Sequence, residues 1–153
     1  MSRPLYEHTQ AGWPMRIAFL ATAVMLVVLA AMPALGQTPA PPLVLIAAAA
    51  VCAIVGWTWG ALTVRIQGGE LQVRFGIGWP RRTIPLAEIA AVEVTRTTFL
   101  EGWGLHRTRR GWLYNVSGLD AVLLKLASGQ SMMVGTDEPR RLKAAIERAQ
   151  ARR

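Results

Sequence analysis

The chain has 153 residues, of which 52% are hydrophobic, and 17 basic against 9 acidic side chains give it a formal net charge of +8. This apolar content is too high for an ordinary small soluble protein. The single cysteine, Cys52, excludes an intramolecular disulfide and a cysteine metal cluster.

The hydrophobic residues are concentrated in one region. Residues 17–64 form a run of 48 residues without a charged side chain, and three prolines at 36–42 divide it into apolar segments at 17–35 and 43–62. Each segment has the length of about 20 residues that a helix needs to cross a bilayer's hydrocarbon core. We therefore expect a transmembrane helical hairpin over residues 17–62.

A cleaved signal peptide is the alternative for the first segment. Arg3 and Arg16 precede it, and Ala34-Leu35-Gly36 offers small residues at a plausible cleavage site. The segment is longer than the usual apolar region of a signal peptide, and a second segment follows at once, so we favour an uncleaved hairpin. After cleavage, residues 43–62 would still hold the product in the membrane.

The distribution of basic residues predicts the orientation. Of the 17 basic residues, 15 follow Leu62, whereas the connection at 36–42 carries no charge. By the positive-inside rule, we expect the N-terminal tail at 1–16 and the domain at 63–153 in the cytoplasm, with the connection outside. Tryptophan is enriched at membrane interfaces, and this topology places three at the inner one: Trp13, Trp57 and Trp59.

After Leu62 the pattern changes to the alternation that is typical of strands. Apolar and polar residues alternate on both sides of Gly68-Gly69, which predicts a β-hairpin. Further strands are expected at 83–86, 92–97, 112–116, 122–126 and 131–134, which makes about seven. After Thr136 or Asp137 as the N-cap, an apolar stripe predicts one amphipathic C-terminal helix: Leu142, Ala145, Ile146 and Ala149.

Seven short antiparallel strands and one C-terminal helix are the order of an α+β pleckstrin-homology-like domain. The segments LTVRIQGGELQVRFGIG, IPLAEIAAVEV, RRGWLYNVSG and VGTDEP resemble the pleckstrin-homology-like domains of small bacterial membrane proteins, over residues 62–149. The resemblance implies a fold attached to the bacterial inner membrane and no particular reaction. The first hairpin, QGGE, lacks the cations with which eukaryotic members bind phosphoinositides.

The stretch at 102–118, GWGLHRTRRGWLYNVSG, combines basic and aromatic side chains. With two arginines that follow the second strand, it forms the candidate lipid- or partner-binding site: Arg81, Arg82, Trp103, His106, Arg107, Arg109 and Arg110. Near an anionic membrane each cation contributes about 1 kcal/mol, and tryptophan rings insert at the headgroup level. Two simpler explanations remain open, namely that the arginines only set the orientation and that Trp112 is a core residue.

No motif indicates an enzyme, a cofactor or a metal site. Ser117, His106 and Asp120 supply the residue types of a hydrolase triad, but no GxSxG turn surrounds Ser117. The histidines and carboxylates are scattered singly, without the spacing of metal ligands. The motif Asn115-Val116-Ser117 matches a glycosylation acceptor, which a cytoplasmic location would leave unmodified.

The sequence thus predicts a non-enzymatic, membrane-anchored interaction or scaffolding module, with an anionic-lipid headgroup sensor as the alternative. Membrane lipids and a protein partner are expected, and nucleic acid is not, because the positive charge is dispersed. A homo-oligomer is a further option, since small residues recur every fourth position along one face of the second apolar segment: Ala48, Cys52, Gly56 and Gly60.

Overall fold

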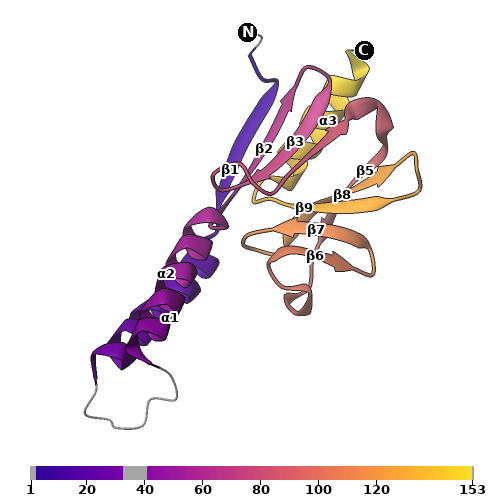
Figure 1. Cartoon of the computed structure of the whole chain (residues 1–153). Coiled ribbons are helices and arrows are strands. Elements are labelled where there is room, and N and C mark those ends of the chain that lie inside the picture. Colours follow the sequence, from indigo (N-terminus) through magenta and orange to yellow (C-terminus); the bar gives the residue numbers. More distant parts are fainter. Residues whose placement is uncertain (1–2, 33–40, 153) are drawn as a thin grey trace.

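The structure is a computed structural model that describes residues 3–32 and 41–152. Within these ranges the chain forms three α-helices and nine strands in two sheets (Figure 1). The elements are β1 (Tyr6–Ala11), α1 (Trp13–Ala31), α2 (Pro42–Thr58), β2 (Ala61–Gln67), β3 (Glu70–Phe75), β4 (Arg81–Pro85), β5 (Ile89–Arg96), β6 (Gly104–Thr108), β7 (Gly111–Asn115), β8 (Asp120–Leu126), β9 (Ser131–Gly135) and α3 (Pro139–Ala151), with short 3₁₀ turns at Leu86–Glu88 and Phe99–Glu101.

The first sheet has the order β1-β2-β3-β4 and is antiparallel throughout. The second has the order β5-β8-β9-β7-β6, in which β7 and β9 are the parallel pair. One core contains side chains of both sheets and of α3, and its largest fully buried members are Phe75, Leu62, Ile66, Leu71, Leu124 and Ile146.

The helices α1 and α2 lie side by side and project together from one end of the β domain (Figure 1). They approach closely at Gly56, where a Cβ atom would lie 2.7 Å from the Cβ of Phe19. Apart from this contact face, most of their large apolar side chains are exposed, from Ile17 to Met32 and from Leu43 to Trp57. A continuous apolar surface of this kind is unusual on a soluble monomer and indicates a membrane or a protein interface.

The predicted fold class, a two-span hairpin followed by about seven strands, is wrong. Among the described residues, α1 is the one helix that is long and apolar enough to cross a membrane, and it lies near the N-terminus. The second helix has 17 residues because it ends at Thr58. Ala61 and Leu62, which the sequence analysis assigned to the second span, begin β2 instead. Most of the connection predicted outside falls in residues 33–40, beyond the described ranges.

Two strands explain the larger strand number. Residues 6–11, assigned to an N-terminal tail, form β1 at the edge of the first sheet, and β6 forms an edge of the second. The sequence of β1, YEHTQA, does not alternate apolar and polar residues, so it gave no strand signal. Thr9 and Gln10 instead make side-chain hydrogen bonds to Thr63 and Ser117. β6 has one large apolar residue, Leu105, against the core. The other seven strands overlap segments in which alternation predicts a strand.

The C-terminal helix has the predicted apolar stripe, whose four residues are all buried: Leu142, Ala145, Ile146 and Ala149. They pack on β5 and β8 of the second sheet and on β2 of the first. Near the helix end, Gln150 Nε2 donates hydrogen bonds to the carbonyl oxygens of Leu86 (3.0 Å) and Ile89 (2.8 Å). The helix therefore closes the core between the two sheets.

We predict that Leu142→Ala combined with Ile146→Ala strongly destabilises the protein. Truncating a buried aliphatic side chain to alanine costs about 2–5 kcal/mol, which is a large part of the stability of a small domain. Thermal unfolding of the full chain in detergent, followed by circular dichroism, measures the change. The exposed pair Arg140→Ala and Glu147→Ala on the same helix is the matched control. Equal unfolding temperatures of the two double variants would show that the stripe does not stabilise the core.

Candidate functional site

The β6–β7 hairpin and the β8–β9 turn border a polar recess of about 450 Å³. Arg107 and Trp112 lie directly opposite each other in β6 and β7, so their side chains leave the same face of the hairpin. Gln130 and Ser131 form the other wall, and Arg109 lies in the turn between the strands. Trp112 is 48% exposed and is therefore a surface residue, which removes the explanation that it belongs to the core.

The recess continues toward β4 of the other sheet. A neighbouring hollow of about 280 Å³ shares Trp112, Gln130 and Ser131 with it and adds Arg82. Burial raises the pKa of the Tyr114 phenol, and the positive charge of Arg82 opposes that shift, so Arg82 lies within electrostatic range of Tyr114. Together, six residues of these two hollows form what we call the basic recess: Arg82, Arg107, Arg109, Trp112, Gln130 and Ser131.

Arg81 lies beyond one end of the basic recess, in a third hollow of about 330 Å³ that also contacts Arg82. In the β3–β4 ladder, Arg81 lies opposite Arg74. In the described part of the chain, no ion pair engages Arg81, Arg82, Arg107 or Arg109. The fold therefore brings these four predicted site residues to one connected surface and leaves their charges without a carboxylate partner there.

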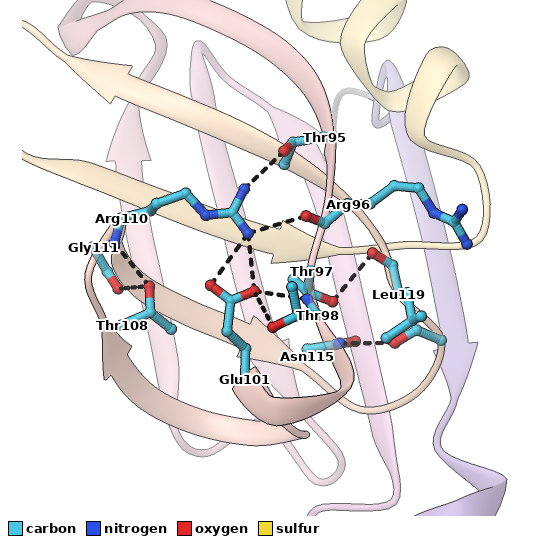
Figure 2. Close-up of polar contacts among 11 residues, drawn as sticks. Thr95, Arg96, Thr97, Thr98, Glu101, Thr108, Arg110, Gly111, Asn115 and Leu119 are labelled. Atoms are coloured by element: carbon cyan, nitrogen blue, oxygen red, sulfur yellow. Dashed lines mark hydrogen bonds and ion pairs between the residues drawn. The ribbon is translucent and has the colours of Figure 1, made fainter.

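Arg110, by contrast, is a structural residue (Figure 2). Its Nη1 donates a hydrogen bond to Thr95 Oγ1 (3.0 Å), and its Nη2 donates to the carbonyl oxygen of Arg96 (3.0 Å). Nη2 also lies 2.9 Å from Glu101 Oε2. The guanidinium thus ties the β6–β7 turn to the end of β5, and its charge is already paired.

Glu101 holds Arg110 in place and also stabilises the 3₁₀ turn before β6 (Figure 2). Its Oε2 accepts hydrogen bonds from the backbone N–H of Thr98 (2.7 Å) and from Thr98 Oγ1 (3.3 Å). The backbone hydrogen bond lowers the pKa of Glu101, and Arg110 lowers it further against the opposing effect of burial. The carboxylate form is therefore the one that stabilises this junction.

Trp103 and His106 lie apart from the basic recess. Trp103 packs edge-on against Phe99, with 6.1 Å between ring centroids, and its Nε1 donates to the carbonyl oxygen of Gly118 (3.3 Å). His106 lies opposite Leu113 in the β6–β7 ladder. Because successive residues of a strand point to opposite faces, His106 and Arg107 leave different sides of the hairpin.

Polar residues at the end of β7 and just after it have structural roles. Asn115 is fully buried; its Nδ2 donates to the carbonyl oxygen of Gly118 and its Oδ1 accepts from the Ser117 backbone, so the glycosylation motif is inaccessible. Ser117 Oγ donates to the carbonyl oxygen of Ala11 (3.1 Å). Gln10 Nε2 also donates to Ser117 Oγ, which occupies this hydroxyl with β1.

The predicted site did not include Gln130 and Ser131, and it left open whether Trp112 inserts at a membrane surface or belongs to the core. The 48% exposure of Trp112 places it at the surface. Gln130 and Ser131 reach the recess only because β9 lies parallel beside β7. That pairing joins segments without a local sequence signal, so no pattern could have identified them.

No protein-family model matches the chain, and no curated protein matches it either. The resemblance to bacterial pleckstrin-homology-like domains therefore stays a prediction, and the function has to be argued from the geometry of this chain.

Replacing Glu101 with glutamine tests the Arg110 junction. Because the folded-state pKa of Glu101 is lowered, its contribution to the free energy of unfolding is fully present above the ordinary carboxyl pKa. The contribution is lost as the pH falls through the lowered value. We expect Glu101→Gln to be less stable than the wild type at pH 7, by roughly 1 kcal/mol as for a partly exposed ion pair.

The two proteins should converge in stability as the pH falls through the lowered pKa of Glu101, below the ordinary carboxyl range, because the folded protein then protonates this side chain. Urea unfolding across this pH range measures the difference, with Glu88→Gln, an exposed carboxylate, as the control. A stability gap that does not change with pH would contradict an electrostatic role for Glu101.

Proposed function

We propose that the protein is a non-enzymatic, membrane-anchored interaction module whose basic recess binds an acidic segment of a partner protein. Its location is proposed as the cytoplasmic face of the bacterial inner membrane, with the β domain beside the bilayer. The apolar helix α1, with α2 packed beside it, supplies the anchor, and the recess supplies the binding surface.

The anchor is supported by α1. This helix has 19 residues and a length of about 28 Å, close to the thickness of the hydrocarbon core. Its outward side chains are apolar, as are those of α2 beside it. Since β1 leads into α1 and α2 leads into β2, and since these strands pair, the start of α1 and the end of α2 both lie next to the β domain. The excess of basic residues after Leu62 favours the cytoplasmic side for that domain.

The basic recess carries the proposal for a partner. Three arginines without a carboxylate partner in the described chain surround a half-exposed tryptophan, and arginine and tryptophan are enriched at the energetic centres of protein interfaces. Gln130 and Ser131 add hydrogen-bonding groups to the same surface. A segment with glutamate or aspartate and an apolar residue for Trp112 matches this arrangement.

The position of the recess favours a protein over a lipid. The β8–β9 turn, which forms one wall, lies on the side of the domain remote from the helix pair (Figure 1). A membrane around α1 would lie along these helices, and the β8–β9 turn lies to the side, away from them. A partner protein on the membrane surface can approach the recess from that side.

Photo-crosslinking in native membranes tests this function. We expect a benzophenone side chain in place of Trp112 to give a discrete protein adduct, and the same group in place of Ala87, exposed in a 3₁₀ turn, to give none. Arg107→Gln with Arg109→Gln should reduce the adduct roughly tenfold, because two exposed ion pairs together contribute on the order of 1.4 kcal/mol.

The matched control is Arg140→Gln with Arg148→Gln, which removes the same charge from the exposed face of α3. It should leave the adduct unchanged. Adducts with lipid alone would support the headgroup sensor and overturn the proposal, and so would a protein adduct that is insensitive to Arg107 and Arg109.

A further inference from the structure

The β3–β4 loop, residues 76–80, is held against the end of α2. The backbone N–H of Gly76 donates to the carbonyl oxygen of Ala61 (2.9 Å). Gly76 has φ of +31°, and a Cβ atom there would collide with the carbonyl of Thr58, the last residue of α2. This close contact fixes the base of the loop at the point where the helix pair meets the first sheet.

Two large apolar side chains project from this loop. Ile77 is 74% exposed and Trp79 is 71% exposed. Two backbone hydrogen bonds close the loop: Gly78 N–H donates to the carbonyl oxygen of Phe75 (2.7 Å), and Phe75 N–H donates to that of Pro80 (3.0 Å). These hydrogen bonds hold Ile77 and Trp79 in solvent, where their apolar side chains do not stabilise the core. Exposed apolar groups of this kind indicate a contact with another molecule.

The same end of the helix pair carries further interfacial residues. Trp13 begins α1 and Trp57 lies one residue before the end of α2, and both are largely exposed. The guanidinium carbon of Arg16 lies 5.6 Å from the ring centroid of Trp13 and 5.9 Å from that of Trp57. Tryptophan beside a cation is typical of the membrane–water interface. Because Gly76 contacts Thr58, the β3–β4 loop lies next to this level of the helix pair.

Positive charge flanks the apolar tip of the loop. Arg74 and Arg81 lie opposite each other where β3 ends and β4 begins, and they border the hollow that Ile77 also lines. Among the described residues, the carboxylate that pairs with Arg74 is Glu7, whose Oε1 lies 3.7 Å from Nη2. Apolar residues at a tip and cations at its base match the order of layers at a membrane surface, where phosphates lie above the acyl chains.

We propose that the β3–β4 loop is a membrane-inserting anchor, which places Ile77 and Trp79 at the boundary of headgroups and acyl chains and Arg74 and Arg81 on lipid phosphates. This inference rests on the proposed membrane location of the helix pair. A third attachment point away from the helix axis fixes the rotation of the β domain on the membrane. It holds the basic recess in one orientation relative to the bilayer.

Fluorescence quenching in vesicles tests the depth of the loop. In the full chain with Cys52→Ala, an environment-sensitive fluorophore is attached to one new cysteine at a time: Ile77→Cys in the loop, Val24→Cys in the middle of α1, or Ser128→Cys in the β8–β9 turn. We expect lipids brominated near the headgroup to quench the label at position 77 and lipids brominated deep in the chains to quench position 24. Position 128 should be quenched by neither.

The anionic lipid is tested separately. Vesicles that contain phosphatidylglycerol should quench position 77 more strongly than vesicles of phosphatidylcholine alone, by about twofold or more. Arg74→Gln with Arg81→Gln should remove that difference, whereas Arg140→Gln with Arg148→Gln should not. An equal response in both lipids would overturn the role of Arg74 and Arg81.

The results distinguish a failure of the loop proposal from a failure of the proposed membrane location. Quenching at position 24 without quenching at position 77 would overturn the inserted loop and leave the membrane location standing. Absence of quenching at position 24 would overturn the membrane location, and the loop inference with it.

Discussion

The antiparallel pairing of β1 with β2 is the interaction on which the arrangement of the chain depends. The ladder runs from Tyr6 opposite Ile66 to Ala11 opposite Ala61, and the backbone hydrogen bond from Gly12 to Gly60 (2.9 Å) continues it to the start of the helices. Because each strand joins its helix within two or three residues, the helix pair cannot turn relative to the first sheet without breaking this ladder. The β domain and the apolar helices therefore form one continuous body, and a membrane around the helices would fix the orientation of the domain.

β1 also connects the first sheet to the rest of the domain through polar contacts. Gln10 Nε2 donates to the carbonyl oxygen and to Oγ of Ser117 (3.0 and 3.1 Å), which joins β1 to the end of β7. His8 Nε2 lies 2.6 Å from Asp137 Oδ1, just before α3. Polar networks that are partly shielded from water specify one arrangement of the elements more strongly than apolar packing alone. A strand with almost no apolar residues thus links the helix pair, the second sheet and α3.

The parts of the fold that could be predicted from the sequence are those with a local pattern. Alternation identified the strands from Ala61 onward, except β6, and spacing identified the buried stripe around Leu142 and Ile146, because a period of two or of 3.6 is visible in adjacent residues. β1 could not be predicted, since its own residues are mostly polar and its partner strand lies 54 residues away at Thr9 and Thr63. The second helix was drawn too long because Ala61 and Leu62 are apolar in a strand and in a span alike.

The candidate site was predictable in the same limited sense. The prediction grouped five residues of 102–118 by proximity in the chain and added Arg81 and Arg82, which follow the second strand, but only the fold shows which of the seven already have partners. Arg110 pairs with Glu101 and is structural. Arg107 and Arg109 line one hollow and Arg82 lines the neighbouring one, and none of the three has a carboxylate partner in the described chain.

That β1 holds the helix pair on the sheet is tested most directly by a disulfide between Thr9→Cys and Thr63→Cys, whose Oγ1 atoms lie 2.9 Å apart. In the full chain with Cys52→Ala, reconstituted in lipid, we expect rapid and complete formation of this bond. Thr9→Cys with Thr83→Cys, across the sheet on β4, should form none. A Thr9–Thr63 pair that remained reduced and fully labelled by a thiol reagent would contradict the account.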